Sequence, residues 1–261
     1  MIPVLFSTGS LHTFGLVRIF RWVAGAGYDG VEVMMDDRWD THQPEYLRAL
    51  SEEYGLPIRA LHPPLGRGMW GVDRDETLVR ATSLAAEVGA KVLVAHPPQE
   101  GDLESWRERV LVRARAEGVA VAVENLVPRV VRRFPLGRRT PGRCLPEQLL
   151  GMGGVTLDTS HCAASGVDIL QVLPALAGEL RHVHLSDSRL EGGDEHLLPG
   201  QGRLPLRRFL HALQGFGYAG AVSLELYPEA LGAPEEEKIL YRMRATLEYV
   251  REGMEGFRAR R

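Results

Sequence analysis

Residues 155–161 read Val-Thr-Leu-Asp-Thr-Ser-His, an apolar, β-branched run that ends on an acid and is followed by a histidine. Such a run is typical of a buried strand. Asp158 and His161 are costly to bury without partners, so their place at the end of a core strand requires an explanation. The other strands of the chain provide one, because several of them end in the same way.

Apolar, β-branched runs recur at regular intervals, and stretches with helical periodicity lie between them. The predicted strands are Val4–Phe6, Val31–Met34, Ile58–Leu61, Val92–Ala95, Val119–Val123, Val155–Leu157, His182–Leu185 and Val222–Leu226. Strands that alternate with helices indicate a parallel sheet, and eight of them in 261 residues predict one (β/α)8 TIM barrel over residues 1–261. A doubly wound open sheet is the alternative α/β fold.

The segment Gly25–Gly30 matches the letters of the dinucleotide fingerprint G-x-G-x-x-G. It follows a predicted helix and precedes a predicted strand, which is the reverse of the context that nucleotide binding needs. We therefore predict a helix C-cap and a turn here.

A long connection at about residues 126–145 interrupts the regular alternation and is rich in arginine, including Arg133. Long loops inside compact domains are usually functional or disordered. In a barrel the loop after a strand lies on the carboxyl face, where substrates bind. Two interpretations of this connection are therefore possible: a solvated basic loop, or a lid that contacts an anion.

The composition is that of an ordinary globular protein, with 44% hydrophobic and 25% charged residues. The net charge of −3 implies no general attraction to nucleic acid or membranes. Two cysteines make no disulfide framework, and we find no signal peptide and no run of about 20 apolar residues, so we expect a cytoplasmic protein.

Acids and histidines stand at or near the ends of the third to the eighth predicted strands. They are His62, His96, Glu124, Asp158 with His161, His182 and His184 with Asp187, and Glu225. A single such residue is more often structural than functional. In a closed parallel barrel, however, all of these ends face one mouth, where clustered carboxylates and imidazoles are the ligands of a divalent metal ion.

The segment Asp194–Gly202, "DEHLLPGQG", follows the seventh predicted strand. Asp194 and His196 are separated by one residue, which places both side chains on one side of an extended segment. The Pro-Gly-x-Gly that follows predicts a tight turn that closes the loop.

Together, these motifs resemble the xylose-isomerase-like TIM-barrel superfamily, which includes sugar isomerases and epimerases, inosose-processing enzymes and endonuclease IV. The resemblance covers nearly the whole chain and rests on "GYDGVEV", "ALHPP", "VAHPP", "VAVEN", "LDTSH", "VHLSDS", "DEHLLPGQG" and "GYAGAVSLELYP". The last four occur in the order and spacing of the family.

The resemblance implies a metal site. In sugar-active members one divalent ion is held by residues that match Glu124, Asp158, His184 and Glu225. The endonuclease IV branch adds ligands that match His62, His96, His161, Asp194 and His196, which build a three-zinc site. One ion (Mn, Zn, Mg or Co) is the expectation, and up to three zinc ions is the alternative.

The favoured hypothesis is an isomerase or epimerase that acts on a sugar, polyol or keto-sugar, with or without a phosphate. The metal would stabilise an enediolate, and Glu124 and Glu225 would transfer the proton. Glu32, His62, His96, His161 and Arg133 are the predicted substrate-binding residues. A dehydratase on an inosose-like substrate would use the same groups.

The alternative is an endonuclease IV-like enzyme that cleaves abasic DNA with a multinuclear zinc site. The negative net charge and the acids in "MMDDRWD" argue against a nucleic-acid partner. A metal-bound barrel without catalysis is a third reading. The predicted partner is a small molecule, and a homo-oligomer remains open because related barrels often pair.

Overall fold

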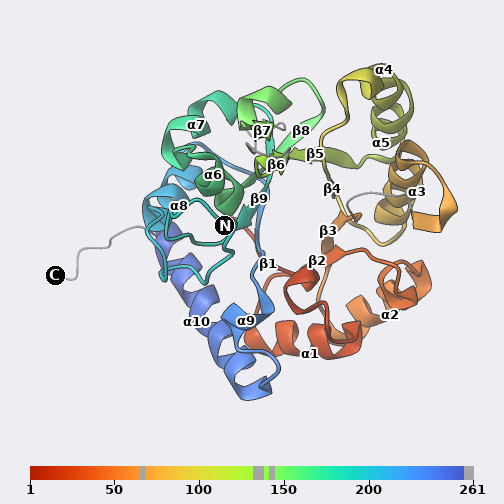
Figure 1. The fold of residues 1–261 in the computed structure, drawn as a ribbon. Helices are drawn as coiled ribbons and strands as arrows, with labels where there is room; N and C mark the ends of the chain where they lie inside the picture. The colour runs from red at the N-terminus through yellow and green to blue at the C-terminus, as the bar shows by residue number, and fades with distance from the viewer. Residues whose placement is uncertain (65–68, 132–137, 141–144, 256–261) are drawn as a thin grey trace.

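Eight strands pair in parallel around a closed ring in the computed structural model, which describes residues 1–64, 69–131, 138–140 and 145–255 (Figure 1). The barrel strands are β1 (Val4–Ser7), β2 (Val31–Met34), β3 (Ile58–His62), β4 (Val92–Ala95), β5 (Ala120–Glu124), β8 (Gly154–Asp158), β9 (Leu180–Leu185) and β10 (Ala221–Leu224). Each of them overlaps one predicted strand.

Pairing between the first and last strands closes the ring. Val4 of β1 pairs with Val222 of β10, and Phe6 of β1 pairs with Val31 of β2. The order around the barrel is β1-β10-β9-β8-β5-β4-β3-β2. The predicted (β/α)8 barrel is confirmed, and the open sheet is excluded because an open sheet leaves two edge strands unpaired.

Helices surround the barrel (Figure 1). They are α1 (Leu16–Ala26), α2 (Pro44–Tyr54), α3 (Arg74–Glu87), α4 (Leu103–Ser105), α5 (Val112–Glu117), α6 (Thr159–Ser165), α7 (Ile169–Leu176), α8 (Leu206–Gly215), α9 (Pro228–Leu231) and α10 (Glu236–Glu255). A π-helical segment, Trp106–Leu111, joins α4 to α5, and short 3-10 helices cover Thr8–Leu11, Trp39–Thr41, Met69–Gly71, Glu100–Asp102 and Pro146–Leu149. Within the described ranges, no helix combines the length and the apolar character needed to cross a membrane.

The glycine motif after α1 has the predicted structure. The helix ends at Ala26, and Gly27 follows with a φ of 91°, in the left-handed region that favours glycine at a helix C-cap. The next strand, β2, begins at Val31. The segment is therefore a helix-to-strand turn, as predicted.

Alternation along each strand separates an apolar layer from a polar interior. On β8, Val155 and Leu157 belong to the hydrophobic core, whereas Thr156 and Asp158 are buried outside that apolar cluster. On β9, Val183 and Leu185 belong to the same hydrophobic core. Because side chains along a strand alternate between its two faces, every second residue of these strands points into the barrel.

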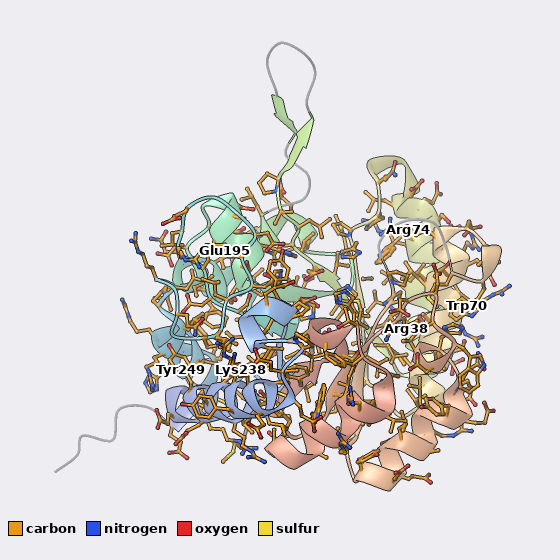
Figure 2. All side chains as sticks on the ribbon, turned by 60° about the horizontal axis from the view of Figure 1, so that its bottom comes forward. Arg38, Trp70, Arg74, Glu195, Lys238 and Tyr249 are labelled. Carbon is orange, nitrogen blue, oxygen red and sulfur yellow. The ribbon has the colours of Figure 1, made fainter. Side chains whose placement is uncertain are left out.

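The long connection after β5 contains an antiparallel hairpin that the sequence did not predict. Its strands are β6 (Arg129–Val131) and β7 (Arg138–Thr140), and Val130 pairs with Arg139. The hairpin strands project away from the barrel (Figure 2). Arg133, the predicted substrate-binding arginine of this connection, lies outside the described residues.

Candidate active site

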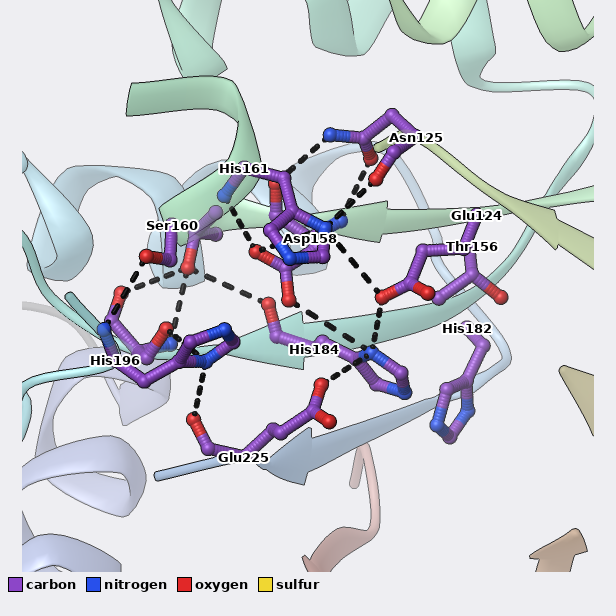
Figure 3. Close-up of polar contacts among 12 residues, drawn as sticks. Glu124, Asn125, Thr156, Asp158, Ser160, His161, His182, His184, His196 and Glu225 are labelled. Carbon is purple, nitrogen blue, oxygen red and sulfur yellow. Dashed lines mark hydrogen bonds and ion pairs between the residues drawn. The ribbon is translucent and has the colours of Figure 1, made fainter. Parts of the chain in front are cut away.

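The carboxyl ends of β5, β8, β9 and β10 bring the four predicted core ligands together (Figure 3). Glu124 and Asp158 are the last residues of β5 and β8, His184 is next to last in β9, and Glu225 follows β10 directly. One ligand atom from each residue lies within 4.8 Å of the others. We call these residues the mouth layer.

His184 lies at the centre of the mouth layer. Its Nδ1 is 2.7 Å from Glu124 Oε1, 2.8 Å from Glu225 Oε2 and 3.8 Å from Asp158 Oδ2. A ring nitrogen carries at most one proton, so it cannot satisfy all of these oxygens. Glu225 Oε2 and Asp158 Oδ2 are buried and have no hydrogen-bond partner among the described residues. This crowding of buried acids calls for a cation, since each unpaired oxygen is costly to bury.

The protonation of the mouth layer reflects this crowding. Burial lowers the pKa of His184, but the carboxylates Glu32, Glu225 and Glu124 outweigh burial and raise it well above its ordinary value. Burial raises the pKa of Glu124, but the charge and hydrogen bond of His184 outweigh it and hold that pKa well below its usual range. Burial also raises the pKa of Asp158. A proton on His184 therefore offsets only part of the negative charge of the acids, and a divalent ion would displace it.

His62 and His96, at the ends of β3 and β4, flank the far side of Glu124. His96 Nε2 is 3.2 Å from Glu124 Oε2, and His62 Nε2 is 3.8 Å from the same oxygen. His62 is 3% exposed, and neither of its ring nitrogens has a hydrogen-bond partner among the described residues. A buried imidazole without partners is available for a ligand or substrate.

His161, Asp194 and His196 form a third group beside Asp158. Asp194 Oδ1 is 3.0 Å from His196 Nε2, and Asp194 Oδ2 is 3.6 Å from His161 Nε2. Burial lowers the pKa of His196, but the hydrogen bond to Asp194 and the nearby acids outweigh it and raise the pKa to about 9. All the predicted metal-ligating residues are thus brought together at one end of the barrel.

Helix α6 begins immediately after β8 and was not predicted as a helix. Asp158 is its N-cap residue, and its Oδ1 accepts a hydrogen bond of 2.7 Å from the His161 backbone N–H. Asn125 accepts a bond from the Asp158 backbone N–H, and the backbone oxygen of Asn125 lies 2.8 Å from His161 Nδ1 (Figure 3). Asn125 therefore positions both residues of the motif at 155–161. The only feature of the sequence that could have pointed to Asn125 is its position directly after Glu124.

The loop that carries Asp194 and His196 is held by two further residues. Ser160 Oγ donates to Asp194 Oδ1 at 2.8 Å and accepts from the His196 backbone N–H at 3.3 Å. Asp187 accepts backbone N–H groups of Gly200 at 2.9 Å and Leu204 at 3.1 Å. These bonds confirm the tight closure that the Pro-Gly-x-Gly pattern predicted.

Glu32 lies deeper in the barrel. Its Oε2 is 2.5 Å from His182 Nε2 and 3.1 Å from His184 Nε2, and all of these side chains are fully buried. We call Glu32 and His182 the deep layer. Glu32 was predicted to bind substrate, and the structure places it behind His184 rather than at the open rim. His182 was named from the sequence only as part of the seventh predicted strand and was assigned neither as a metal ligand nor as a substrate-binding residue, although its spacing of two from His184 puts both on one face of β9.

The open side of the site is lined by partly exposed groups. The side chains of Glu225, His161 and Asp194 are 17%, 13% and 28% exposed, whereas Glu124 and His184 are buried. Tyr227, which the sequence analysis did not single out, is 43% exposed, and its ring centroid lies 5.1 Å from that of His196. A substrate therefore has access from the side of Glu225, Asp194 and Tyr227.

The fold and the site define a class of protein, a (β/α)8 barrel with a convergent acid and histidine centre at the carboxyl ends of its strands. The family model of the xylose isomerase-like TIM barrel matches residues 20–249. The chain belongs to this family, which confirms the resemblance found in the sequence.

Relatives of the chain have comparable lengths. An uncharacterized protein of Mycobacterium leprae (strain TN) is 31% identical over 264 residues, which cover 92% of this chain and 94% of the relative. The "Putative hydroxypyruvate isomerase" of Streptomyces coelicolor is 30% identical over 240 residues, which cover 78% and 83%. The crystal structure of a D-tagatose 3-epimerase-like protein covers 97% of each chain with a TM-score of 0.75 and 21% identity, a likeness in fold.

Proposed function

We propose that this protein is a divalent-metal-dependent isomerase or epimerase that acts on a keto-sugar or a related small hydroxycarbonyl compound. The observation that carries the proposal is the convergence of Glu124, Asp158, His184 and Glu225 within 4.8 Å of one another. The site rather than the fold indicates the reaction, because one barrel fold supports many chemistries.

The relatives support the same class of reaction. The Streptomyces coelicolor relative bears the name of a hydroxypyruvate isomerase, and the similar solved structure is of a D-tagatose 3-epimerase-like protein. Both names describe enzymes that move a proton next to a carbonyl group. The endonuclease alternative has no such support from these relatives and is not favoured.

The mouth layer fits a divalent ion. It offers the carboxylate and imidazole ligands that Mn, Zn, Mg or Co accept, and two of its buried oxygens, Asp158 Oδ2 and Glu225 Oε2, lack hydrogen-bond partners among the described residues. When bound, the ion would polarise a substrate carbonyl and lower the pKa of the adjacent C–H group.

Glu225 and Glu124 are the proposed proton-transfer groups. A carboxylate takes the proton from the carbon next to the carbonyl, and the proton returns to the opposite face in an epimerase or to the neighbouring carbon in an isomerase. Glu225 is the more accessible of the two, with its side chain 17% exposed against 1% for Glu124. His96, His161 and Asp194 at the rim are placed to hold substrate hydroxyls.

Deuterium exchange tests the proposal directly. The metal-stripped protein, reloaded with Mn²⁺, would be incubated in D₂O with hydroxypyruvate and a panel of ketopentoses and ketohexoses. We expect deuterium next to the carbonyl, detected by NMR, together with a rearranged product for at least one substrate. No exchange with any substrate, combined with three tightly bound zinc ions and cleavage of an abasic duplex, would overturn the proposal.

A further inference from the structure

His184 is held from both sides by carboxylates. Its Nδ1 lies 2.7 Å from Glu124 Oε1 in the mouth layer, and its Nε2 lies 3.1 Å from Glu32 Oε2 in the deep layer. A metal-ligating histidine needs one nitrogen free of protons, and the group that accepts the proton of the other nitrogen decides which one. If Glu32 accepts the proton of Nε2, then Nδ1 is left as the nitrogen that can bind the metal.

We propose that Glu32 is a positioning residue that holds the His184 ring with Nδ1 directed at Glu124, Asp158 and Glu225, and that His182 in turn holds Glu32. This inference rests on the proposed metal-dependent function. Glu32 does not touch the reacting atoms in this proposal; it sets the orientation and tautomer of the histidine that does bind the ion.

The geometry of the deep layer supports this role. Glu32 Oε2 accepts from His182 Nε2 at 2.5 Å as well as from His184 Nε2, and the two rings, 5.3 Å apart between centroids, are nearly perpendicular at 87°. One oxygen thus bridges two histidines that project from the same face of β9.

A role in substrate binding fits Glu32 less well. The side chain is 0% exposed, and its other oxygen, Oε1, faces His62 Nδ1 at 3.7 Å rather than the rim. The contacts of Glu32 on the side of the mouth layer are with the rings of His184 and His62. A buried carboxylate is suited to orient the histidines that it contacts, because Glu32 Oε2 lies within hydrogen-bond distance of both rings and offsets their charge.

A second ion among Glu32, His182 and His184 is the competing explanation, since their ligand atoms also lie within 4.8 Å of one another. The separation of 3.1 Å to His184 is that of a hydrogen bond, and the separation of 2.5 Å to His182 is shorter still, so Glu32 Oε2 contacts both nitrogens directly. An ion there would also require His184 to use both nitrogens as ligands. The hydrogen-bonded arrangement is therefore the one we propose, and the ion count tests it.

Metal affinity is the first measurement. Mn²⁺ binding to metal-stripped protein would be titrated for the natural chain, Glu32→Gln and Thr156→Val. Thr156 is a matched control because it is a fully buried barrel-interior residue whose hydroxyl donates to the Ala122 carbonyl at 3.2 Å and not to His184. We expect Glu32→Gln to weaken binding by about 10- to 100-fold, as for other partners of metal-bound histidines, and Thr156→Val to change it by less than about 3-fold.

Crystal structures of the metal-free natural protein and of Glu32→Ala provide a readout that does not depend on the metal. We expect the His184 ring of Glu32→Ala to turn away so that Nδ1 no longer contacts Glu124. An unchanged ring overturns the positioning role, even if the natural protein binds no ion and the proposed function fails. If Glu32→Ala does not fold, the same comparison is made with Glu32→Gln.

The titration has two further outcomes that overturn the inference. One is an unchanged affinity in Glu32→Gln while Glu124→Gln abolishes binding. The other is a fall in stoichiometry from two ions to one in Glu32→Gln, which would assign a second metal site to the deep layer. Loss of affinity at constant stoichiometry, with a displaced His184 ring, supports it.

Discussion

The mouth layer and the deep layer both contain a buried glutamate against His184, yet their surroundings differ. Glu124 shares its space with Asp158 and Glu225, whereas Glu32 faces histidines. Burial raises the pKa of Glu32, but the charges and hydrogen bonds of His184 and His182 outweigh it and hold that pKa well below its usual range. The deep acid is therefore neutralised by the protein itself.

The mouth layer lacks such an internal balance. Its three acids converge on His184 and outnumber the protons that this ring can offer. Buried oxygens without a hydrogen-bond partner among the described residues occur in both layers, Asp158 Oδ2 and Glu225 Oε2 in the mouth layer and Glu32 Oε1 in the deep layer, so the difference lies in the number of converging acids. The comparison teaches that a single carboxylate between histidines can be neutralised by the protein, while several carboxylates that converge on one point indicate an ion-binding centre. Changes in one layer or the other test this distinction.

The largest effect is expected for Glu225→Gln. Loss of a proton-transfer carboxylate should reduce the rate of deuterium exchange by about 10²- to 10⁴-fold. Ser223→Ala is the matched control, because Ser223 lies two residues earlier, is fully buried and has an Oγ without a hydrogen-bond partner in the described structure. We expect Ser223→Ala to retain the rate within a few-fold, as measured by NMR. Equal losses in both variants would show that the loss is not specific to the Glu225 carboxylate.

The next largest effect is expected for the pH dependence of the stability of the metal-free protein. A histidine whose pKa is raised on folding contributes its full stabilisation at pH values below its pKa in the unfolded chain, about 6.5. This contribution is lost as the pH rises through the pKa in the folded protein, which is about 9 for His196. The stabilisation from His196 amounts to at most about 3 kcal/mol. Denaturant unfolding between pH 6.5 and 9.5 should show the loss.

His196→Gln provides the control for the pH measurement. It should be less stable at pH 6.5 and should lose less stability between pH 6.5 and 9.5 than the natural protein. Parallel curves for the two proteins would assign the pH dependence to other groups.

Binding of an ion to the mouth layer should stabilise the folded protein. At a free Mn²⁺ concentration of about 100 times Kd, binding to the folded state alone adds about 2.7 kcal/mol to the free energy of unfolding. Thermal unfolding with and without Mn²⁺ measures this gain, and a chelator should reverse it. Glu124→Gln should abolish the gain, since it removes a ligand; a gain retained in that variant would place the ion elsewhere.

Gly202→Ala should have a smaller effect, which acts on the loop that carries Asp194 beside the mouth layer. A Cβ at this position would clash with the Asp187 carboxylate and the Ser188 carbonyl, so the loop that carries Asp194 must shift. We expect a loss of about 1–3 kcal/mol in the free energy of unfolding. Gly193→Ala, in the same loop with only an ordinary contact to Glu195, is the control and should be nearly neutral.

Tyr227→Phe should have the smallest effect. The Tyr227 hydroxyl donates to the Asp194 backbone oxygen at 3.3 Å, and the residue is 43% exposed. Loss of this bond should cost less than about 1 kcal/mol of stability, because water replaces the partner. If Tyr227→Phe instead raises the KM of the substrate strongly without a stability change, the ring or hydroxyl contacts the substrate.

The sequence by itself determined the barrel and the residues that face its mouth. Strands have a side-chain period of two and parallel strands share one carboxyl edge, so Glu124, Asp158, His184 and Glu225 could be placed together from their positions alone. That these residues hold a metal ion and transfer a proton remains a prediction.

The tertiary structure alone decided which groups pair across the barrel. Glu32 and His184 are 152 residues apart, and no local pattern reveals that one carboxylate contacts both His182 and the rear nitrogen of His184. The same holds for Asn125, whose bonds to Asp158 and His161 depend on the register between β5 and β8. Such contacts follow from strand register and ring orientation, which are set only when the barrel closes.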